Sequence, residues 1–560
     1  MRQYLKSVSA RSGDEQRPSA HRFTLRLGRF LRDESGALIV FGLIMFVMML
    51  IIGGIAVDIM RFETVRGKLQ STADRAALAA AALSSTQDPT AVVNDYFAKE
   101  QLSQYLIGIT VVSSGSFRSV TANVQAEVPT YFMPMIGVNS LTAPADSSAE
   151  ESVADVEVSL VLDVSGSMRS NSRLTNLKVA AKNFVDTLLA GDVEGRVSIT
   201  IIPFSGQVNM GATLAANYTL STQHTLNTCV DFPTADFSTA AVLPGTLLTR
   251  SDPIDPWSNT ATKASLTSFG FPAGTEMNYC STATNNVVRP YLRDIPTLKA
   301  IIDGLAADGN TSINMGVKWA IAMLDPGTQP VIDNLIATGQ VSAAFAGRPF
   351  AYNSGGPAKV IIVMSDGENT SQWTARPSYK SGPSPIDRDP VDGSLAVFHA
   401  TVAAPNQYYV IPQANFSTSY TGSALGTWQS TVPAGYVNLT WPEVFNLHPV
   451  IWVARYMYGN ALGTTSSTRQ SIATTWRSNL MTSVAPSVMN TQLDAACDLA
   501  KAPAQNIRVF TVAFEAPLAG QTALLNCASS DGDYFQTTGT GIIAVFEAIA
   551  RQISQLRLTQ

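Results

Sequence analysis

The strongest hydrophobic signal in this chain is an uninterrupted apolar run near its start. Gly36 to Val57 contains 22 residues without a charge. At about 1.5 Å per residue, a helix of this length spans the hydrocarbon core of a bilayer, which is about 30 Å thick. From Arg61 to Ser84 alanine and leucine dominate, and helix-favouring residues fill the polar positions. We therefore predict one transmembrane helix with an extension, over residues 36–84.

A two-residue rhythm follows in residues 85–150. Leu106 to Ser113 and Ser119 to Pro129 are rich in β-branched residues, and Leu141 to Ser148 is a third candidate strand. One face of the middle strand carries only small and β-branched residues: Val120, Ala122, Val124, Ala126 and Val128. This pattern predicts a small β-rich stalk. The polar, acidic stretch 146–155 is interpreted as a linker that ends it.

From residue 151 to residue 560 apolar strands alternate with amphipathic helices, as a parallel sheet requires. Strands are expected at 156–162, 196–204, 360–364, 507–513 and 534–535, and helices at 174–189, 297–305, 313–324, 490–501, 518–526 and 542–556. The fold class is therefore α/β with a mainly parallel sheet.

Two long insertions interrupt this alternation, at about 205–296 and 369–486. The second insertion contains five of the seven tryptophans. These aromatic residues either form a partner-binding surface or fill the core of a small subdomain.

Polar side chains stand where the first buried strand ends. Asp163, Ser165 and Ser167 follow the apolar run 156–162, and open α/β sheets place ligands at this end of their strands. All three are hard oxygen donors, which suits Mg²⁺. Alone, the pattern also describes a polar strand-to-helix turn with serine as the N-cap.

Two later stretches make the pattern more specific. Residues 308–316 form a glycine-containing turn that opens a helix and offers Thr311, and residues 359–369 are a buried strand that ends in Asp366-Gly367. With these loops the sequence resembles the von Willebrand factor type A (vWA) family, whose metal-ion-dependent adhesion site (MIDAS) uses three such loops in this order.

The vWA resemblance implies a Rossmann-like, doubly wound fold and a set of metal ligands. Ser165, Ser167 and Thr311 would bind Mg²⁺, with Mn²⁺ as the alternative ion, and Asp163 and Asp366 would act mostly through bound waters. A vWA domain that binds no metal stays open as an alternative.

The N-terminal region carries a second resemblance. Residues 33–36 before the span, 56–58 at its exit and 69–81 beyond it are similar to the TadE/TadG-like proteins of the bacterial tight-adherence (Flp pilus) system. The TadG-like members join this anchor to a vWA domain. The resemblance implies that the small stalk region is pilin-like α+β and that partners are pilus or secretion subunits. Phe41 stands where prepilin-like members carry glutamate, so we expect the anchor to be retained.

The flanking charges predict the orientation of the anchor. Residues 1–35 form a basic tail with eight basic and four acidic side chains. Such a tail stays in the cytoplasm, which places the bulk of the chain in the periplasm of a single-pass inner-membrane protein. A cleaved signal peptide is the competing interpretation. Its apolar core is usually shorter, and no small-residue cleavage site precedes Asp58 here.

The cysteines agree with an oxidising compartment. Four cysteines allow three pairings, and proximity in the sequence favours Cys229 with Cys280 and Cys497 with Cys527. No Cys-x₂-Cys spacing for zinc is present. The net charge of −5, without a basic patch, argues against nucleic acid as a partner.

Nothing in the sequence favours an enzyme. Gly-x-Ser-x-Gly, a P-loop and His-Glu-x-x-His are all absent, and the four histidines lie outside any catalytic motif. We predict a membrane-anchored, metal-dependent protein-binding component of Flp-type pilus assembly or adhesion, whose partner supplies a carboxylate to the metal. The alternative is a structural pilus or secretion scaffold in which the vWA domain is a spacer without metal.

Overall fold

The computed structural model describes residues 35–82, 85–114, 117–152, 155–190, 192, 195–352, 358–416 and 425–559. The chain forms two compact units, Met1–Ser152 and Val153–Gln560. The basic tail that we predict to be cytoplasmic, except for Ser35, lies outside the described residues.

The first unit begins with one long helix, α2 (Ser35–Ala81). From Leu38 it is long and apolar enough to cross a membrane, with a mean hydropathy of 2.9 in its most apolar window. Its side chains from Leu38 to Met60 are mostly exposed, whereas Leu69, Ala73 and Ala76 are buried. The helix predicted from the apolar run and its alanine-rich extension is confirmed.

A four-stranded antiparallel sheet packs on the extension of α2. It consists of β1 (Leu106–Ser114), β2 (Phe117–Pro129), β3 (Ser140–Pro144) and β4 (Ser147–Ser152), and β2 pairs with the other three strands. The face of β2 predicted from its alternation is buried, and Val120, Ala122 and Val124 contact the core residues of α2.

The structure adds one helix that was not predicted in this region, and it corrects the interpretation of residues 146–155 as a linker. Residues 89–99 form a helix, α3 (Pro89–Lys99), whose Val93 and Phe97 complete the core. Asp88 caps it by accepting the Ala91 backbone N–H, and a proline follows at the first position. Residues 146–155, predicted to be a linker, contain β4. Although these residues are polar, their backbone pairs with β2 and forms a strand of the sheet.

The second unit is built on a six-stranded sheet with the strand order β19-β18-β10-β5-β6-β9. The first five strands are parallel, and β9 runs antiparallel to β6. The strands are β5 (Val156–Asp163), β6 (Val197–Phe204), β9 (Arg289–Leu292), β10 (Ala358–Ser365), β18 (Arg508–Phe514) and β19 (Tyr534–Thr537). Every residue of β5, β6 and β10 is buried, as strands covered on both faces must be.

Helices cover both faces of this sheet. One face packs on α4 (Arg173–Leu189), α6 (Ile295–Gly304) and α15 (Gly541–Thr559). The other packs on α7 (Ile313–Leu324), α13 (Pro486–Lys501) and α14 (Leu518–Cys527). Alternate residues of β5 serve the two cores, Leu160 on the first face and Val161 on the second. A further helix, α8 (Gln329–Ala337), was not predicted.

The first insertion is shorter than predicted. β9, the edge strand of the main sheet, falls inside the range 205–296, so the sheet resumes at Arg289. The insertion itself contains α5 (Gly211–Ala215) and a pair of short strands, β7 (Val230–Asp231) and β8 (Thr249–Arg250).

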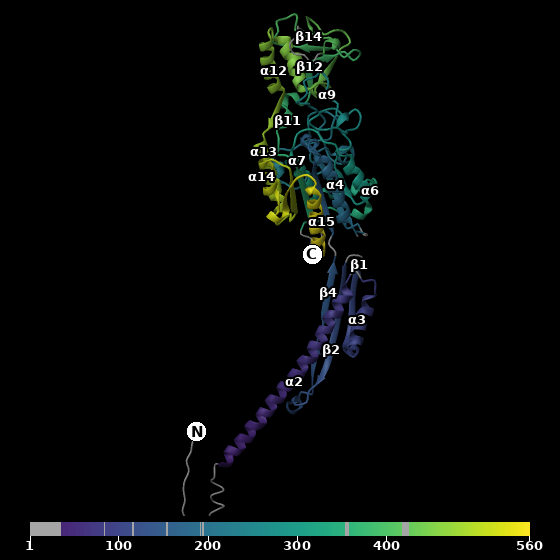
Figure 1. Cartoon of the computed structure of the whole chain (residues 1–560), viewed down its shortest axis with the longest axis vertical. Helices are drawn as coiled ribbons and strands as arrows, with labels where there is room; N and C mark the ends of the chain where they lie inside the picture. The colour runs from purple at the N-terminus through teal and green to yellow at the C-terminus, as the bar shows by residue number, and fades with distance from the viewer. Residues whose placement is uncertain are drawn as a thin grey trace, which may run out of the picture. The chain divides into compact units, whose positions relative to one another are not determined.

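The second insertion folds as a subdomain, shown in green at one end of the second unit in Figure 1, and its core also includes Ile254 and Tyr279 of the first insertion. It leaves and re-enters the main body through paired strands β11 (Gln372–Ala375) and β17 (Met481–Val484). A five-stranded antiparallel sheet holds β12 (Pro383–Arg388), β13 (Leu395–Phe398), β14 (Tyr408–Ile411), β15 (Thr427–Gln429) and β16 (Val437–Thr440). The helices are α9 (Trp441–Leu447), α10 (Val450–Trp452), a π-helical turn (Val453–Gly459), α11 (Asn460–Leu462) and α12 (Ser466–Leu480).

All five tryptophans of the second insertion lie in the core of this subdomain or pack against it. Trp441 and Trp452 are buried in it, and the others pack against it partly exposed. Of the two interpretations given above, the subdomain core is the one that the structure supports.

Both disulfides expected from sequence proximity are present. Cys229–Cys280 closes the first insertion, and Cys497–Cys527 joins α13 to α14.

Candidate functional site

The first loop of the site leaves β5 at its carboxyl end. Asp163 ends the buried strand, and a short 3₁₀ turn, Gly166–Arg169, follows. The Asp163 carboxylate is fully buried. One of its oxygens accepts the Ser165 backbone N–H at 2.7 Å, and the other accepts the Ser365 hydroxyl from the end of β10. These two bonds fix the carboxylate between neighbouring parallel strands.

The second loop, residues 308–312, precedes α7 and is tied to the first by its backbone. The Gly166 N–H donates to the Gly309 carbonyl at 2.9 Å, and the Asp308 N–H donates to the Val164 carbonyl at 2.9 Å. Gly309 has a φ of +83°, a conformation that glycine adopts without strain. Thr311 is thereby buried at the start of α7.

The third loop follows β10 and carries Asp366. Its carboxylate accepts the Ser167 hydroxyl at 2.7 Å, while the Ser167 and Ser165 hydroxyl oxygens lie 3.0 Å apart. A side chain at Gly367 would come within 3.3 Å of the Thr311 hydroxyl, so the glycine keeps space beside that oxygen. The structure therefore brings the five predicted residues Asp163, Ser165, Ser167, Thr311 and Asp366 together from three loops.

The two carboxylates disfavour each other's charge. Burial raises the pKa of Asp163, and the charge of Asp366 raises it further, against the hydrogen bonds from Ser365 and Ser165. Burial also raises the pKa of Asp366, opposed by Ser167 and Arg173. A cation between such groups would lower both pKa values, because it favours the ionised forms.

One positive charge already lies at the edge of the site. The Arg173 guanidinium pairs with Asp366 at 2.7 Å and with Glu515 at 2.8 Å. The bond from Arg173 in turn lowers the pKa of Glu515. Arg173 thus holds the outer oxygen of Asp366 in a fixed direction.

Sequence reasoning gave no role to Arg173, Glu515 or Ser365. Arg173 and Glu515 are 342 residues apart, and no local pattern relates them. The only available signal for Arg173 was its place as the first residue of the helix after the Asp-x-Ser-x-Ser motif.

The donor set fits a hard divalent cation. It consists of three hydroxyl oxygens and two carboxylates, which are the ligands that Mg²⁺ takes in proteins. Among the described residues, no group of three or more His, Cys, Asp or Glu side chains is placed to hold a metal ion. An ion at this position would therefore depend on Ser165, Ser167 and Thr311, whose neutral hydroxyls leave much of its charge uncompensated.

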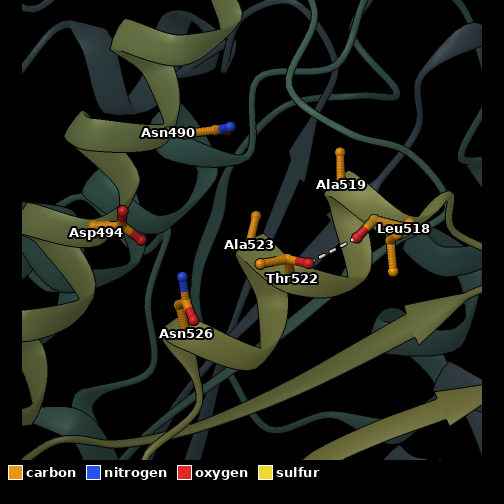
Figure 2. Close-up of a pocket in the computed structure, with 7 residues that line it drawn as sticks. All are labelled: Asn490, Asp494, Leu518, Ala519, Thr522, Ala523 and Asn526. Carbon is orange, nitrogen blue, oxygen red and sulfur yellow. Dashed lines mark hydrogen bonds between the residues drawn. The ribbon is translucent and has the colours of Figure 1, made fainter.

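An open groove of about 570 Å³ runs between α13 and α14, beside the third loop. Figure 2 shows Asn490 and Asp494 on one helix, facing Leu518, Ala519, Thr522, Ala523 and Asn526 on the other. Asn490 accepts a bond of 2.8 Å from Asn369, which connects the groove to the loop of Asp366. None of its lining residues belongs to the predicted metal set.

Residues 36–83 match the family model described as "Putative Flp pilus-assembly TadE/G-like". The long N-terminal helix of this chain is thus a TadE/G-like segment, as its sequence indicated. No curated protein matches the chain.

Several solved structures from pili are similar to the chain at low identity. The vWF domain of the type V pili tip protein Mfa5 from Porphyromonas gingivalis is 13% identical, with 73% of this chain and 97% of that chain covered and a TM-score of 0.28. The pilus adhesin SpaC from Lactobacillus rhamnosus GG is 12% identical over 80% of this chain and 34% of that one, with a TM-score of 0.28. The adhesive tip pilin GBS104 from Group B Streptococcus agalactiae is 11% identical over 72% and 100%, with a TM-score of 0.29. Similarities this low carry no functional inference.

Proposed function

We propose that this chain is a membrane-anchored, metal-dependent protein-binding component of Flp-type pilus assembly or adhesion at the bacterial envelope. The observation that carries the proposal is the meeting of two buried carboxylates and three hydroxyls at the carboxyl edge of a mainly parallel sheet. The TadE/G-like segment supports the pilus setting. The bulk of the chain would lie in the periplasm, beyond an inner-membrane anchor.

In this proposal the second unit is a doubly wound vWA domain. Its strand order, with later strands added on both sides of β5, and its helices on both faces support that assignment. The three loops would form a MIDAS. Ser165, Ser167 and Thr311 would bind Mg²⁺, and Asp163 and Asp366 would act mostly through waters.

The proposed activity is binding, not catalysis. An ion held mainly by neutral hydroxyls attracts a further anionic ligand, so a partner's aspartate or glutamate would complete its coordination. The described histidines, His224, His399 and His448, are buried within the two insertions, where they would not serve as a base at this site.

Calorimetric titration of Mg²⁺ and Mn²⁺ into the full chain in detergent micelles tests the proposal. Asp163→Ala removes the carboxylate that accepts hydrogen bonds from Ser165 and Ser365. We expect the affinity for the ion to fall by about 10- to 100-fold. The exposed Asp303→Ala, whose carboxylate pairs with Lys182 on the surface, is the matched control and should bind like the unchanged chain. Equal binding by Asp163→Ala would refute the site.

One observation favours a second candidate, a structural spacer that needs no metal. The Arg173 guanidinium compensates the charge of Asp366 without any ion. Under this alternative the unchanged chain gives no heat with either ion, and capture of pilus subunits is the same with and without a chelator. Under the first proposal the chelator abolishes capture.

A further inference from the structure

The loop between β2 and β3 presents an exposed apolar surface. No charged residue occurs from Val128 to Ala145. At the tip of the loop, Tyr131 is 69% exposed and Met135 is 65% exposed, and Phe132 and Ile136 are exposed beside them. Contiguous exposed apolar side chains of this kind are rare on soluble proteins, and they typically mark a site of contact with a partner or a membrane.

A buried carboxylate fastens this loop to α2. Asp58 is 1% exposed, and its oxygens accept the backbone N–H groups of Tyr131, Phe132 and Met133 at 2.9, 2.7 and 2.8 Å. Three charge-assisted bonds from consecutive backbone groups hold the loop in one position on the helix.

Two further contacts fix the loop against the same part of α2. A side chain at Gly54 would lie 2.5 Å from the Phe132 ring, so glycine is needed for this close approach. Seven residues further along α2, the Arg61 guanidinium lies 4.0 Å from the centre of the Tyr131 ring, in a cation–π contact.

These contacts define the level of the loop along the helix. The uncharged run of α2 ends at Val57, and Asp58 is the first charge after it. Gly54 lies three residues before Val57, or about 5 Å within the run. Phe132 therefore lies beside the last turn of the predicted span, and with the span in a bilayer Tyr131 and Arg61 would lie where the headgroups begin. Tyrosine and arginine are typical of this interfacial zone.

We propose that residues 131–138 insert into the lipid headgroup region beside the exit of α2 and form a second membrane contact of the first unit. The occupant of this apolar surface is the bilayer, because the surface continues the exposed apolar face of the spanning helix. The clamp at Asp58 would then set the angle at which the small sheet leaves the membrane. This inference depends on the membrane span of α2 but not on the metal site.

Depth-dependent quenching of a fluorescent label tests the proposal. The four native cysteines are in disulfides, so Met135→Cys introduces one free thiol for a nitrobenzoxadiazole label. The full chain is placed in vesicles of phosphatidylcholine and phosphatidylglycerol. Lipids that carry a spin label near the headgroup should quench the label several-fold more strongly than aqueous iodide does.

Val112→Cys is the matched control in the same unit. Val112 is 57% exposed and pairs with Ser119 on β2, ten residues before Pro129, or about 33 Å along the strand. Its label should respond to iodide and not to the lipid quencher. Equal iodide access at both positions would overturn the proposal. Protection of position 135 from both quenchers would overturn it as well, because another protein chain would then cover the loop.

The role of Asp58 is tested in the same assay. Asp58→Ala, combined with Met135→Cys, removes the acceptor for three backbone N–H groups and should reduce lipid quenching at position 135 at least two-fold. Unchanged quenching would show that the loop enters the interface without this clamp. The result for the unclamped variant does not affect the comparison of positions 135 and 112, which stands by itself.

Discussion

The position of the site depends on single side chains that connect loops to the helices behind them. The Asn369 amide oxygen accepts the Ile313 backbone N–H at 2.7 Å, and its amide nitrogen donates to Asn490 at 2.8 Å. One residue therefore ties the loop of Asp366 to both α7 and α13. Gly520, in the first turn of α14, supports the same loop from another side, because a side chain there would overlap the Gly367 carbonyl.

Gly520→Ala should displace the loop that carries Asp366. The added methyl group would overlap backbone atoms that cannot rotate away, so we expect the free energy of unfolding to fall by about 1 to 3 kcal/mol. We also expect Mg²⁺ affinity to fall by about 10-fold, measured by calorimetry. Gly304→Ala, at the end of α6 with no atom near the added methyl group, should leave the Mg²⁺ affinity unchanged and should not lower the free energy of unfolding. Full Mg²⁺ affinity in a destabilised Gly520→Ala would show that the loop's position does not control the site.

The five oxygen-bearing residues of the site were predictable because each follows a strong local signal. Asp163 is the last residue of a fully buried strand, Asp366 directly follows another, and Thr311 directly precedes the N-cap of a buried, mostly apolar helix. Arg173 and Glu515 were not predictable, since their pairing exists only after β18 and α4 have packed on the same sheet. Sequence patterns identified the five oxygen-bearing residues that meet here, while the charged residues that orient them could be found only in the tertiary structure.

At the level of elements, burial decided which predictions succeeded. The helix over residues 313–324 and the strands around 158–162 and 360–364 are mostly apolar and fully buried, and the structure has each of them. β4 and β9 were missed because their residues do not favour a strand. β4 is polar and β9 contains a proline, and only their pairing with β2 and β6 makes them strands.

A buried histidine in the subdomain of the second insertion leads us to predict that the stability of the chain depends on pH. The His448 ring stacks on Trp452, with centroids 4.7 Å apart, and burial lowers the pKa of His448 to about 4. The unfolded chain takes up a proton near pH 6.5, whereas the folded chain does not. The free energy of unfolding should therefore fall as the pH drops from about 6.5 to about 4, by about 1 to 3 kcal/mol from this residue, and then level off.

Denaturant unfolding followed by tryptophan fluorescence at about pH 7.5 and about pH 4.5 measures this dependence. His448→Phe keeps an aromatic ring beside Trp452 but carries no titratable group. It should lose some stability at the higher pH, because the bond from the ring to the Ala261 carbonyl is absent. The loss between the two pH values should be smaller than in the unchanged chain. An equal loss would assign the acid sensitivity to other groups.

At the scale of the whole molecule, two independent features support the proposed periplasmic location of the second unit. The basic tail before α2 predicts a cytoplasmic N-terminus. The second unit contains two disulfides, which persist in an oxidising environment outside the cytoplasm. A chain that crosses the membrane once satisfies both conditions only if everything after Asp58 is exported.

This orientation can be tested in cells with one introduced thiol. Val391, in the subdomain of the second insertion, is 91% exposed, and the native cysteines do not react because they are paired. A membrane-impermeant maleimide should label Val391→Cys once the outer membrane is permeabilised, while the inner membrane is still intact. Lysed cells give the full labelling level, and a cytoplasmic thiol protein that stays unlabelled shows that the inner membrane is sealed. Labelling that requires lysis of the inner membrane would place the second unit in the cytoplasm. The disulfides would then lie in a reducing compartment, and the charge-based orientation would be wrong, so this outcome would contradict both arguments together.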